Sequence, residues 1–355
     1  MAIEILKYTK MKKIAVYLSI IVLLASCDGK DVEFPDFTYQ TIYFPVQNPV
    51  RTVVLGDEIR FDSSIDLEKA FSIGVNVGGL YENTIDRKVS IKLAPELVPT
   101  DPNKLLITTT NDTLVILPSN YYKASSLTEM VIPKGSFVGK IRIDLADAFF
   151  NDPKSVNVKY VLPLIINPDP NSKDSVLVGK PAVLNPSRTK RSDWLGGLTP
   201  KDYTLFAVNY TNKNHGVYFI YGADQIYNAA GTLVRTNTYR KPIVTENITT
   251  PLTTLSLSEC LQSLLGGSIT GVTGRMKLKY NDDKTIAISS VKGGFVVTGS
   301  GTYKDPANGV VWGQQGRKTV FLNYNFKDAT GQEHRCKDTL VYRSSGIVYK
   351  EFVLK

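Results

Sequence analysis

Histidine, tryptophan and cysteine are scarce in this chain. Its 355 residues include two histidines, two tryptophans and three cysteines. His215 lies in the turn-like KNHGV and His334 in GQEHRC beside a predicted hairpin, and neither assembles a Ser/His/Asp or Cys/His set by spacing. A strained G-x-S-x-G elbow is missing as well. The sequence therefore predicts no catalytic residues and a protein that is not an enzyme.

Patterns that hold metals or phosphates are also missing. Asp169, Asn171 and Asp174 lie close together in NPDPNSKD, but Lys173 falls where a calcium-binding loop needs a ligand. A turn between strands is the better interpretation of this segment. Gly196-Gly197 and Gly293-Gly294 precede no strand-to-helix phosphate cradle. We expect no metal and no cofactor.

The chain has no basic face that would bind nucleic acid. Its formal net charge is +9, but segments such as KLKYNDDK and RTKRSD mix positive and negative side chains. No positively charged stripe with interleaved base-stacking aromatics emerges. Nucleic acid is therefore excluded as a partner.

The N-terminal apolar run, residues 14–26, is far short of the ~20 residues that cross a bilayer. It follows Lys12 and Lys13, and this order of charge and short apolar run is typical of a secretory signal peptide. Leu24-Ala25-Ser26-Cys27 resembles a bacterial lipobox, which implies removal of residues 1–26 and acylation of Cys27. Such acylation anchors a protein firmly to a membrane. An ordinary signal peptide with an incidental cysteine is the alternative.

Residues 27–40 read as a lipidated flexible tether. Asp28, Asp31 and Glu33 resemble the acidic export signals that send lipoproteins of the Bacteroidetes to the cell exterior. We therefore expect an outer-membrane lipoprotein that faces outward and touches the membrane through its lipid alone. A plain solvated tether is the other interpretation.

Cys260 and Cys336 remain in the mature chain. In an oxidising compartment they could form a disulfide, or they could be two buried thiols. Neither lies in a metal-binding spacing, so both alternatives stay open.

Most of the chain after residue 40 alternates apolar and polar residues with the period of a strand. KVSIKL (88–93), GKIRIDL (139–145) and RMKLKY (275–280) show it, and RMKLKY, NDDK and TIAIS together predict a hairpin. TVFLNYNF (319–326) and DTLVYR (338–343) predict another. Helical periodicity is limited to SLSECLQSLL (256–265) and, weakly, LEKAF (67–71). The fold class is all-β, with sandwich or barrel-like domains.

A polar, basic segment rich in Gly and Pro, LNPSRTKRSDWLGGLTP (184–200), has the composition of a linker. It divides the mature chain into an N-terminal immunoglobulin-like β-sandwich at 41–186, a linker at 187–198 and a C-terminal sandwich or barrel at 199–355. Trp194, inside the linker, is expected to pack the two domains against each other.

Two groups of segments resemble a known family of surface proteins. LPSNYYKASSLTEMVIPKGS (117–136) and KYVLPLIINP (159–168) are similar to the N-terminal domain of Bacteroidetes lipoproteins from glycan-utilisation loci. NYTNKNHGVYFIYG (209–222), VVTGSGTY (296–303), WGQQGRKTVFLNYNF (312–326) and KDTLVYRSSG (337–346) resemble a companion C-terminal domain. The resemblance implies a cell-surface accessory protein with a role like that of SusE and SusF. It also implies a SusC/SusD-type outer-membrane transporter as partner.

A sugar-binding site needs flat aromatic faces beside amide, carboxylate or guanidinium groups. VVWGQQGRK (310–318) places Trp312 near Gln314 and Arg317 in a glycine-rich loop. NYTNKNHGVYFIYG adds the candidate ligand-binding residues Tyr210, Tyr218 and Tyr221. The alternative is that these rings belong to the hydrophobic core.

The sequence therefore leads to a non-catalytic, lipid-anchored surface protein that binds an oligo- or polysaccharide. A structural or adhesin-like subunit with a protein ligand is the rival hypothesis. A glycosidase is a weaker one, because no two of the many carboxylates are marked as a catalytic pair.

Overall fold

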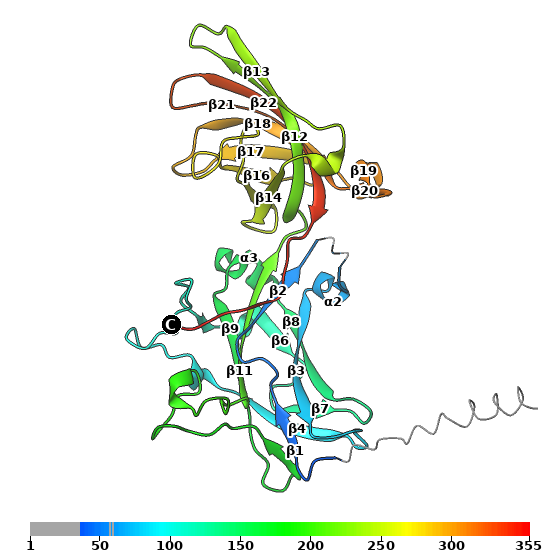
Figure 1. Ribbon diagram of the computed structural model, residues 1–355, viewed down its shortest axis with the longest axis vertical. Helices are drawn as coiled ribbons and strands as arrows, with labels where there is room; N and C mark the ends of the chain where they lie inside the picture. The colour runs from blue at the N-terminus through cyan, green and yellow to red at the C-terminus, as the bar shows by residue number, and fades with distance from the viewer. Residues whose placement is uncertain (1–35, 57, 59) are drawn as a thin grey trace, which may run out of the picture.

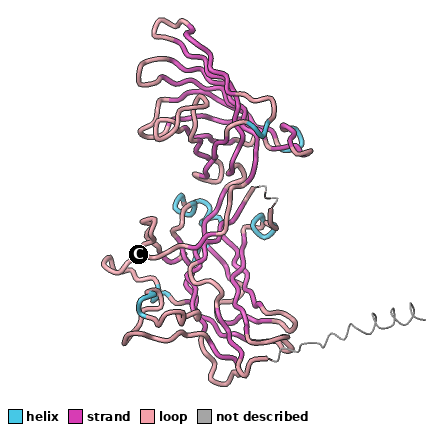
Figure 2. Tube along the Cα trace, in the orientation of Figure 1, coloured by secondary structure: helices cyan, strands magenta, loops and turns pink. Residues whose placement is uncertain are grey.

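The computed structural model describes residues 36–56, 58 and 60–355. The predicted signal peptide, Cys27 and most of the tether lie outside the described residues. No described helix is both long and apolar enough to cross a membrane. The described chain forms two β domains, one above the other in Figure 1, with only short helices between strands (Figure 2). This arrangement confirms the all-β fold class.

The first domain is a sandwich of two sheets. One sheet has the strand order β10-β1-β3-β8-β6 and the other β23-β2-β11-β9-β4-β7, with β5 pairing to β9. Strands β4 and β8 coincide with the alternating segments read from the sequence. The strands are β1 (Gln40–Tyr43), β2 (Pro49–Val54), β3 (Ala70–Gly78), β4 (Arg87–Leu93), β5 (Val115–Ile116), β6 (Tyr122–Ala124), β7 (Glu129–Ile132), β8 (Val138–Leu145), β9 (Tyr160–Ile166), β10 (Asp174–Val176), β11 (Tyr203–Thr211) and β23 (Lys350–Glu351).

Two hydrophobic cores explain the pattern of these strands. The inner faces of both sheets enclose one core, where Phe71 of β3 stacks on Phe206 of β11 with ring centroids 5.3 Å apart. The outer face of the second sheet is covered by loops and by the C-terminal segment, which contributes Phe352 to a further cluster. Strand β9 (YVLPLII) is buried at every residue, because it is covered on both faces. A strand in that position reads as one continuous apolar run.

The second domain is a curled sheet in the order β13-β12-β14-β15-β16-β17-β18-β21-β22, and it closes because β12 also pairs with β22. Alternate side chains fill the interior of this barrel, as in small β-barrels generally. The two predicted hairpins, β16–β17 and β21–β22, are confirmed. The strands are β12 (Gly216–Tyr227), β13 (Leu233–Tyr239), β14 (Thr249–Thr254), β15 (Glu259–Gln262), β16 (Met276–Tyr280), β17 (Thr285–Ser290), β18 (Val297–Lys304), β21 (Thr319–Lys327) and β22 (Glu333–Ser344).

A small hairpin of β19 (Val310–Trp312) and β20 (Gln315–Arg317) forms a separate two-stranded sheet beside the barrel. The helices are all short. They are α2 (Ser64–Leu67), α3 (Asp147–Asn151), η1 (Pro95–Leu97), η2 (Ser119–Tyr121), η3 (Pro153–Val156), η4 (Arg191–Asp193), η5 (Val244–Glu246) and η6 (Pro306–Asn308).

The predicted linker at 187–198 does not separate the domains. The strand that follows it, β11, pairs in parallel with β2 and antiparallel with β9, inside the sheet of the first domain. Trp194 is buried within the first domain, bridged to Pro181, and its Nε1 donates to the Ser187 carbonyl at 2.8 Å. The chain passes into the barrel only after Thr211. It also returns, because β23 pairs with β2 (Figure 1).

Two expectations about local structure are wrong. The segment 256–265 is not a helix: β15 occupies its centre and pairs with both β14 and β16. At LEKAF only Leu67 is helical, as the last residue of α2, and β3 begins at Ala70.

Cys260 and Cys336 are free thiols, both buried. Cys260 Sγ donates to Asn212 Oδ1 at 3.3 Å, and Cys336 Sγ to Asp224 Oδ1 at 3.4 Å. The disulfide alternative is therefore not the one that the structure adopts.

Candidate functional site

The tyrosines proposed from the sequence lie in the protein interior. Tyr210 is 1% exposed in the core of the first domain, where its hydroxyl donates to the Phe150 carbonyl at 2.9 Å. Tyr218 is fully buried in the barrel and donates to the Asn214 carbonyl at 2.9 Å. Tyr221 is also buried, with the Arg240 guanidinium 4.8 Å from its ring centroid. These three side chains serve packing, which corrects their assignment to a ligand site.

Trp312 and Arg317 do lie together, on the β19–β20 hairpin. The Arg317 guanidinium carbon is 4.3 Å from the centroid of the Trp312 ring. The Trp312 and Phe219 rings form an edge-to-face pair with centroids 5.6 Å apart, and Trp312 Nε1 donates to the Tyr342 carbonyl at 3.0 Å. One face of the indole is therefore covered by arginine and is not a free surface for a sugar. Gln314 is exposed at the tip of the hairpin, with a φ of 61°.

An aromatic cleft of about 630 Å³ opens on the first domain beside the returning C-terminal segment. Its walls come from β2, β3 and β11, from the loop that precedes β2, and from residues 347–349. Phe61 and Tyr349 are its exposed rings, at 39% and 68% exposure. The lining residues with aromatic or polar side chains include Phe44, Arg51, Phe61, Asn76, Phe206 and Tyr349.

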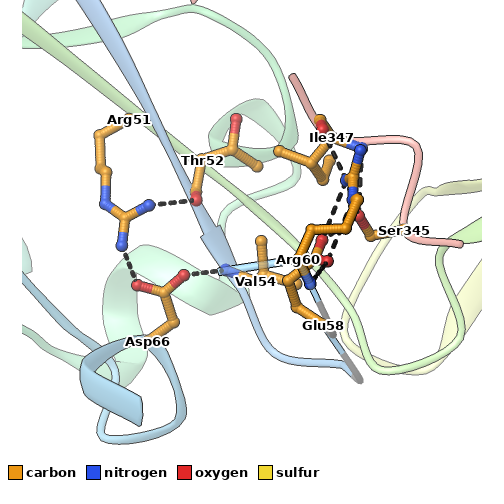
Figure 3. Close-up of polar contacts among 8 residues, drawn as sticks. All are labelled: Arg51, Thr52, Val54, Glu58, Arg60, Asp66, Ser345 and Ile347. Carbon is orange, nitrogen blue, oxygen red and sulfur yellow. Dashed lines mark hydrogen bonds and ion pairs between the residues drawn. The ribbon is translucent and has the colours of Figure 1, made fainter. Parts of the chain in front are cut away.

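The polar wall of the aromatic cleft is held in place by an ion pair. Arg51 of β2 pairs with Asp66 of α2, and its other terminal nitrogen donates to the Thr52 carbonyl at 3.2 Å. The second oxygen of Asp66 accepts from the Val54 amide at 3.0 Å (Figure 3). The Asp66 carboxylate is buried, and burial raises its pKa although these bonds oppose the rise. The Arg51 side chain is thereby fixed in one position beside the cleft.

A second polar network ties the first domain to the segment that leaves the barrel. Arg60 donates to Glu58 Oε2 at 3.0 Å, to Ser345 Oγ at 2.7 Å and to the Ile347 carbonyl at 2.7 Å (Figure 3). Ser345 Oγ in turn donates to Glu58. Burial alone would raise the pKa of Glu58, but the hydrogen bonds from Arg60 and Ser345 lower it to about 2. Glu58 is therefore ionised at neutral pH and locks the two segments together.

A charged cleft of about 620 Å³ lies on the other side of this network, at the junction of the two domains. The first domain contributes Glu58, and the connection between domains contributes Lys213. The barrel side contributes Asp305 beside η6 and the end of the β19–β20 hairpin with Arg317 and Lys318. Glu58 pairs with Arg60, and Asp305 pairs with Lys284 at 2.6 Å. Arg317, from the hairpin singled out in the sequence, thus lines this cleft.

The barrel interior holds the densest group of titratable side chains. His334 Nδ1 lies 2.7 Å from Asp224 Oδ2, and Tyr324 donates to Asp338 at 2.8 Å. Tyr239 also donates to Asp338, whose pKa burial raises to about 6. Asp224 and Asp338 are 2% and 3% exposed, so this cluster is packed away from solvent. Its members bond mainly to one another, and His334 Nε2, which forms no hydrogen bond among the described residues, lies 3.5 Å from Asp328 Oδ2.

His334 is buried and His215 is half-buried, which the sequence did not reveal. His334 was interpreted as a turn residue, yet it is 6% exposed at the second residue of β22. His215 accepts a hydrogen bond from the Thr254 amide at 3.1 Å through Nδ1. Burial lowers the pKa of His215 to about 4, so its imidazole is neutral at pH 7. Among the described residues, no group of three or more His, Cys, Asp or Glu could hold a metal ion.

Comparison with known proteins supports the two-domain description. A family model described as an N-terminal domain matches residues 37–173, and the Domain of unknown function DUF5627 matches residues 213–346. The second match begins just after β11, where the strand pairing also places the start of the barrel. No curated protein matches the chain.

A crystal structure of a protein of unknown function from Bacteroides ovatus is similar over nearly the whole chain. It is 29% identical, with a TM-score of 0.78, and the match covers 90% of this chain and 99% of that one. A second protein of unknown function and a multidomain protein including DUF1735, both from Bacteroides ovatus, are 14% identical with TM-scores of 0.42 and 0.43. Those matches cover 88% and 87% of this chain and 99% and 97% of theirs, and at these scores they support no inference. The comparisons fit a protein of the Bacteroidetes with two β domains.

Sequence reasoning missed the residues of the aromatic cleft. Phe61 and Tyr349 lie far apart in the sequence, and their segments are brought together by the pairing of β23 with β2 and by the hydrogen bonds of Arg60 to Ser345 and Ile347. No local pattern marks either ring.

Proposed function

We propose that this protein is a non-catalytic, lipid-anchored surface protein that binds a glycan in the aromatic cleft. In this proposal Cys27 carries the lipid, and the protein faces the exterior of the outer membrane. It presents the bound glycan to a SusC/SusD-type uptake system. The similarity to Bacteroides proteins agrees with such a setting, and the acidic residues after Cys27 support export.

The observation that carries the proposal is the composition of the aromatic cleft. Phe61 and Tyr349 offer exposed rings to the apolar face of a pyranose. Arg51 and Asn76 line the same space and supply donors to sugar hydroxyls. Arg51 is held by Asp66, so a ligand would meet it already oriented. A volume of about 630 Å³ falls in the range of ordinary small-molecule sites.

The same lining argues for binding without bond cleavage. Among the described residues that line the aromatic cleft there is no Asp, Glu, His or Cys. Glycoside hydrolysis ordinarily needs two carboxyl groups facing the scissile bond. The nearby carboxylates Asp66 and Glu58 are committed to Arg51 and Arg60. The described lining of the cleft can therefore hold a sugar and offers no carboxyl group for its hydrolysis.

Affinity electrophoresis against a panel of soluble polysaccharides tests the proposal. We expect one of the polysaccharides to slow the migration of the protein in the gel. It should no longer do so with Tyr349→Ala or Phe61→Ala, because removal of a stacking ring weakens binding about tenfold or more. Tyr81→Ala is the matched control, since Tyr81 is 75% exposed and lies outside the cleft. Retardation that survives both cleft variants would refute this site. Release of reducing sugar by the purified protein would refute the non-catalytic role.

The anchor has its own test. A radioactive fatty acid should label the protein in cells, and Cys27→Ala should abolish the label. Labelling that persists in the variant would remove the lipid from the proposal.

A further inference from the structure

The charged cleft contains a buried arginine without an acidic partner. Arg317 is 8% exposed, and its Nε is buried without a hydrogen-bond partner within the described residues. The two described carboxylates of this cleft are paired elsewhere, Glu58 with Arg60 and Asp305 with Lys284. Within the described part of the chain, Arg317 forms no ion pair. A buried cation in that state is unusual, because buried charges are normally neutralised by a partner.

The guanidinium packs on an aromatic face. Its carbon lies 4.3 Å from the centroid of the Trp312 ring. Stacking of this kind stabilises a cation without using its N–H groups, so the hydrogen-bonding capacity of the fork remains available. Lys213, an exposed residue on the connection between the domains, adds a second positive charge to the same cleft.

The β19–β20 hairpin holds Arg317 rigidly. Thr319 Oγ1 donates to the Arg317 carbonyl at 2.9 Å and accepts from the Val310 amide at 2.8 Å. Gly316 lies so close to the Pro306 carbonyl that a side chain could not be accommodated there. The hairpin thus fixes the backbone of Arg317, and the Trp312 ring places its guanidinium, so a ligand would meet a preorganised group.

We infer that the charged cleft is an anion subsite in which Arg317 binds the carboxylate or sulfate group of an acidic sugar. A planar guanidinium matches either group through two parallel N–H···O bonds, a geometry that lysine cannot reproduce. The Glu58–Arg60 network separates this subsite from the aromatic cleft, since Glu58 lines one and Arg60 lines the other. The sugar part of this inference rests on the proposed function. An anion subsite would restrict the glycan ligand to one that carries uronic-acid or sulfate groups.

Trp312 provides a direct readout. In a Trp194→Phe background, Trp312 is the single tryptophan of the chain, and an anion bound to the stacked guanidinium changes its fluorescence. The titrants are inorganic sulfate, a galacturonate oligosaccharide, a sulfated galactose oligosaccharide, and two uncharged counterparts: the fully methyl-esterified galacturonate and unsulfated galactose oligosaccharides. Sulfate and at least one acidic oligosaccharide should give a saturable change that is absent with its uncharged counterpart.

The variants separate this role from a structural one. Arg317→Gln should weaken binding of the acidic oligosaccharide at least about tenfold, and Arg317→Lys should bind with intermediate affinity because it keeps only the charge. The matched control is Arg335→Gln, since Arg335 stacks on Tyr227 at 4.2 Å but is already paired with Glu333 at 2.8 Å. That control should bind like the parent protein. Arg317→Lys also protects the test if Arg317→Gln fails to fold.

The possible failures are distinguishable. If neither sulfate nor any acidic oligosaccharide changes the fluorescence, the anion subsite is refuted. If a glycan binds through Tyr349 with the same affinity in Arg317→Gln, the acidic specificity is refuted while the proposed function stands. If sulfate binds through Arg317 and no glycan of the panel binds at all, an anion subsite exists but its sugar ligand is refuted together with the proposed function.

Discussion

Phe352→Ala tests whether the last residues of the chain belong to the first domain. Phe352 is 7% exposed and packs in a cluster with Tyr203 and Leu205 of β11. Its amide donates to the Asn48 carbonyl at 3.0 Å, just ahead of β2. Val353 is the natural control, because it is the next residue along the chain and is 60% exposed.

The expected size follows from the lost packing. Truncation of a fully buried phenylalanine costs about 3–5 kcal/mol. Here the ring lies on the outer face of the sheet, and the terminal segment can undock locally, so we expect about 2–3 kcal/mol. Val353→Ala removes exposed methyl groups and should change the free energy of unfolding by less than about 0.5 kcal/mol.

Guanidinium denaturation and native-state hydrogen exchange measure both effects. Phe352→Ala should lower the unfolding midpoint of the first domain and speed exchange of the Phe352 and Lys355 amides, which donate to Asn48 and Ile107. The aromatic cleft should also bind glycan more weakly, because Tyr349 lies on the segment that undocks. Equal and small effects of the two substitutions would show that this segment is not docked on the first domain.

Three further predictions concern ionisable groups. Burial raises the Asp338 pKa from 3.8 to about 6, so the contribution of Asp338 to the free energy of unfolding is fully present below about pH 3.8 and is lost as pH rises through 6. Melting curves from pH 4 to 7 should show that decline in the parent protein and not in Asp338→Asn. Parallel curves for the two proteins would contradict this prediction. The pKa of Glu58 is lowered from 4.5 to about 2, so its contribution to stability is present above pH 4.5 and is lost as pH falls toward 2. Glu58→Gln should be less stable than the parent protein at pH 7 by about 1–3 kcal/mol, and this difference should shrink in acid. A difference that does not change with pH would refute the network of Figure 3. Burial raises the pKa of Cys260 to about 12 and that of Cys336 as well, so a thiol reagent should modify neither in the native protein and both after denaturation; rapid native labelling would show that the barrel interior is open.

The strands were predictable where one face is buried and the other solvated. In β4 and in the β16–β17 hairpin the apolar residues alternate because alternate side chains enter a core. The same physics explains the error at 256–265. Cys260, Gln262 and Leu264 alternate into the barrel, but the leucines of this segment, at 257, 261, 264 and 265, also have the spacing of one helix face. A short apolar run cannot be assigned by periodicity alone.

The domain boundary was not predictable from composition. The segment 184–200 is polar and glycine-rich because it is a surface loop, and loops inside domains have that composition as often as linkers do. Only the pairing of β11 with β2 and β9 shows that the first domain continues past it. Pairings this distant in sequence leave no local signal, which is also why the aromatic cleft was missed.

In the β19–β20 hairpin the sequence predicted which side chains lie near each other but not which of them are exposed. The glycines around Trp312 predict a loop; the structure has a short hairpin instead, with Trp312 in β19 and Arg317 in β20, and it brings those two side chains together. The sequence could not show that arginine covers the indole, nor that Tyr210 and Tyr218 point into cores. Exposure is a property of the packed fold, and tyrosine suits a core and a binding surface equally well.

Hydrogen-exchange footprinting of the protein with its retarding glycan tests the central claim most directly. The account predicts protection at residues 44–52 and 345–350 around the aromatic cleft, with further protection at 312–318 if the glycan is acidic. Protection confined to the β12–β13 end of the barrel, or an unchanged exchange pattern at saturating glycan, would contradict a binding site between the first domain and the returning C-terminal segment.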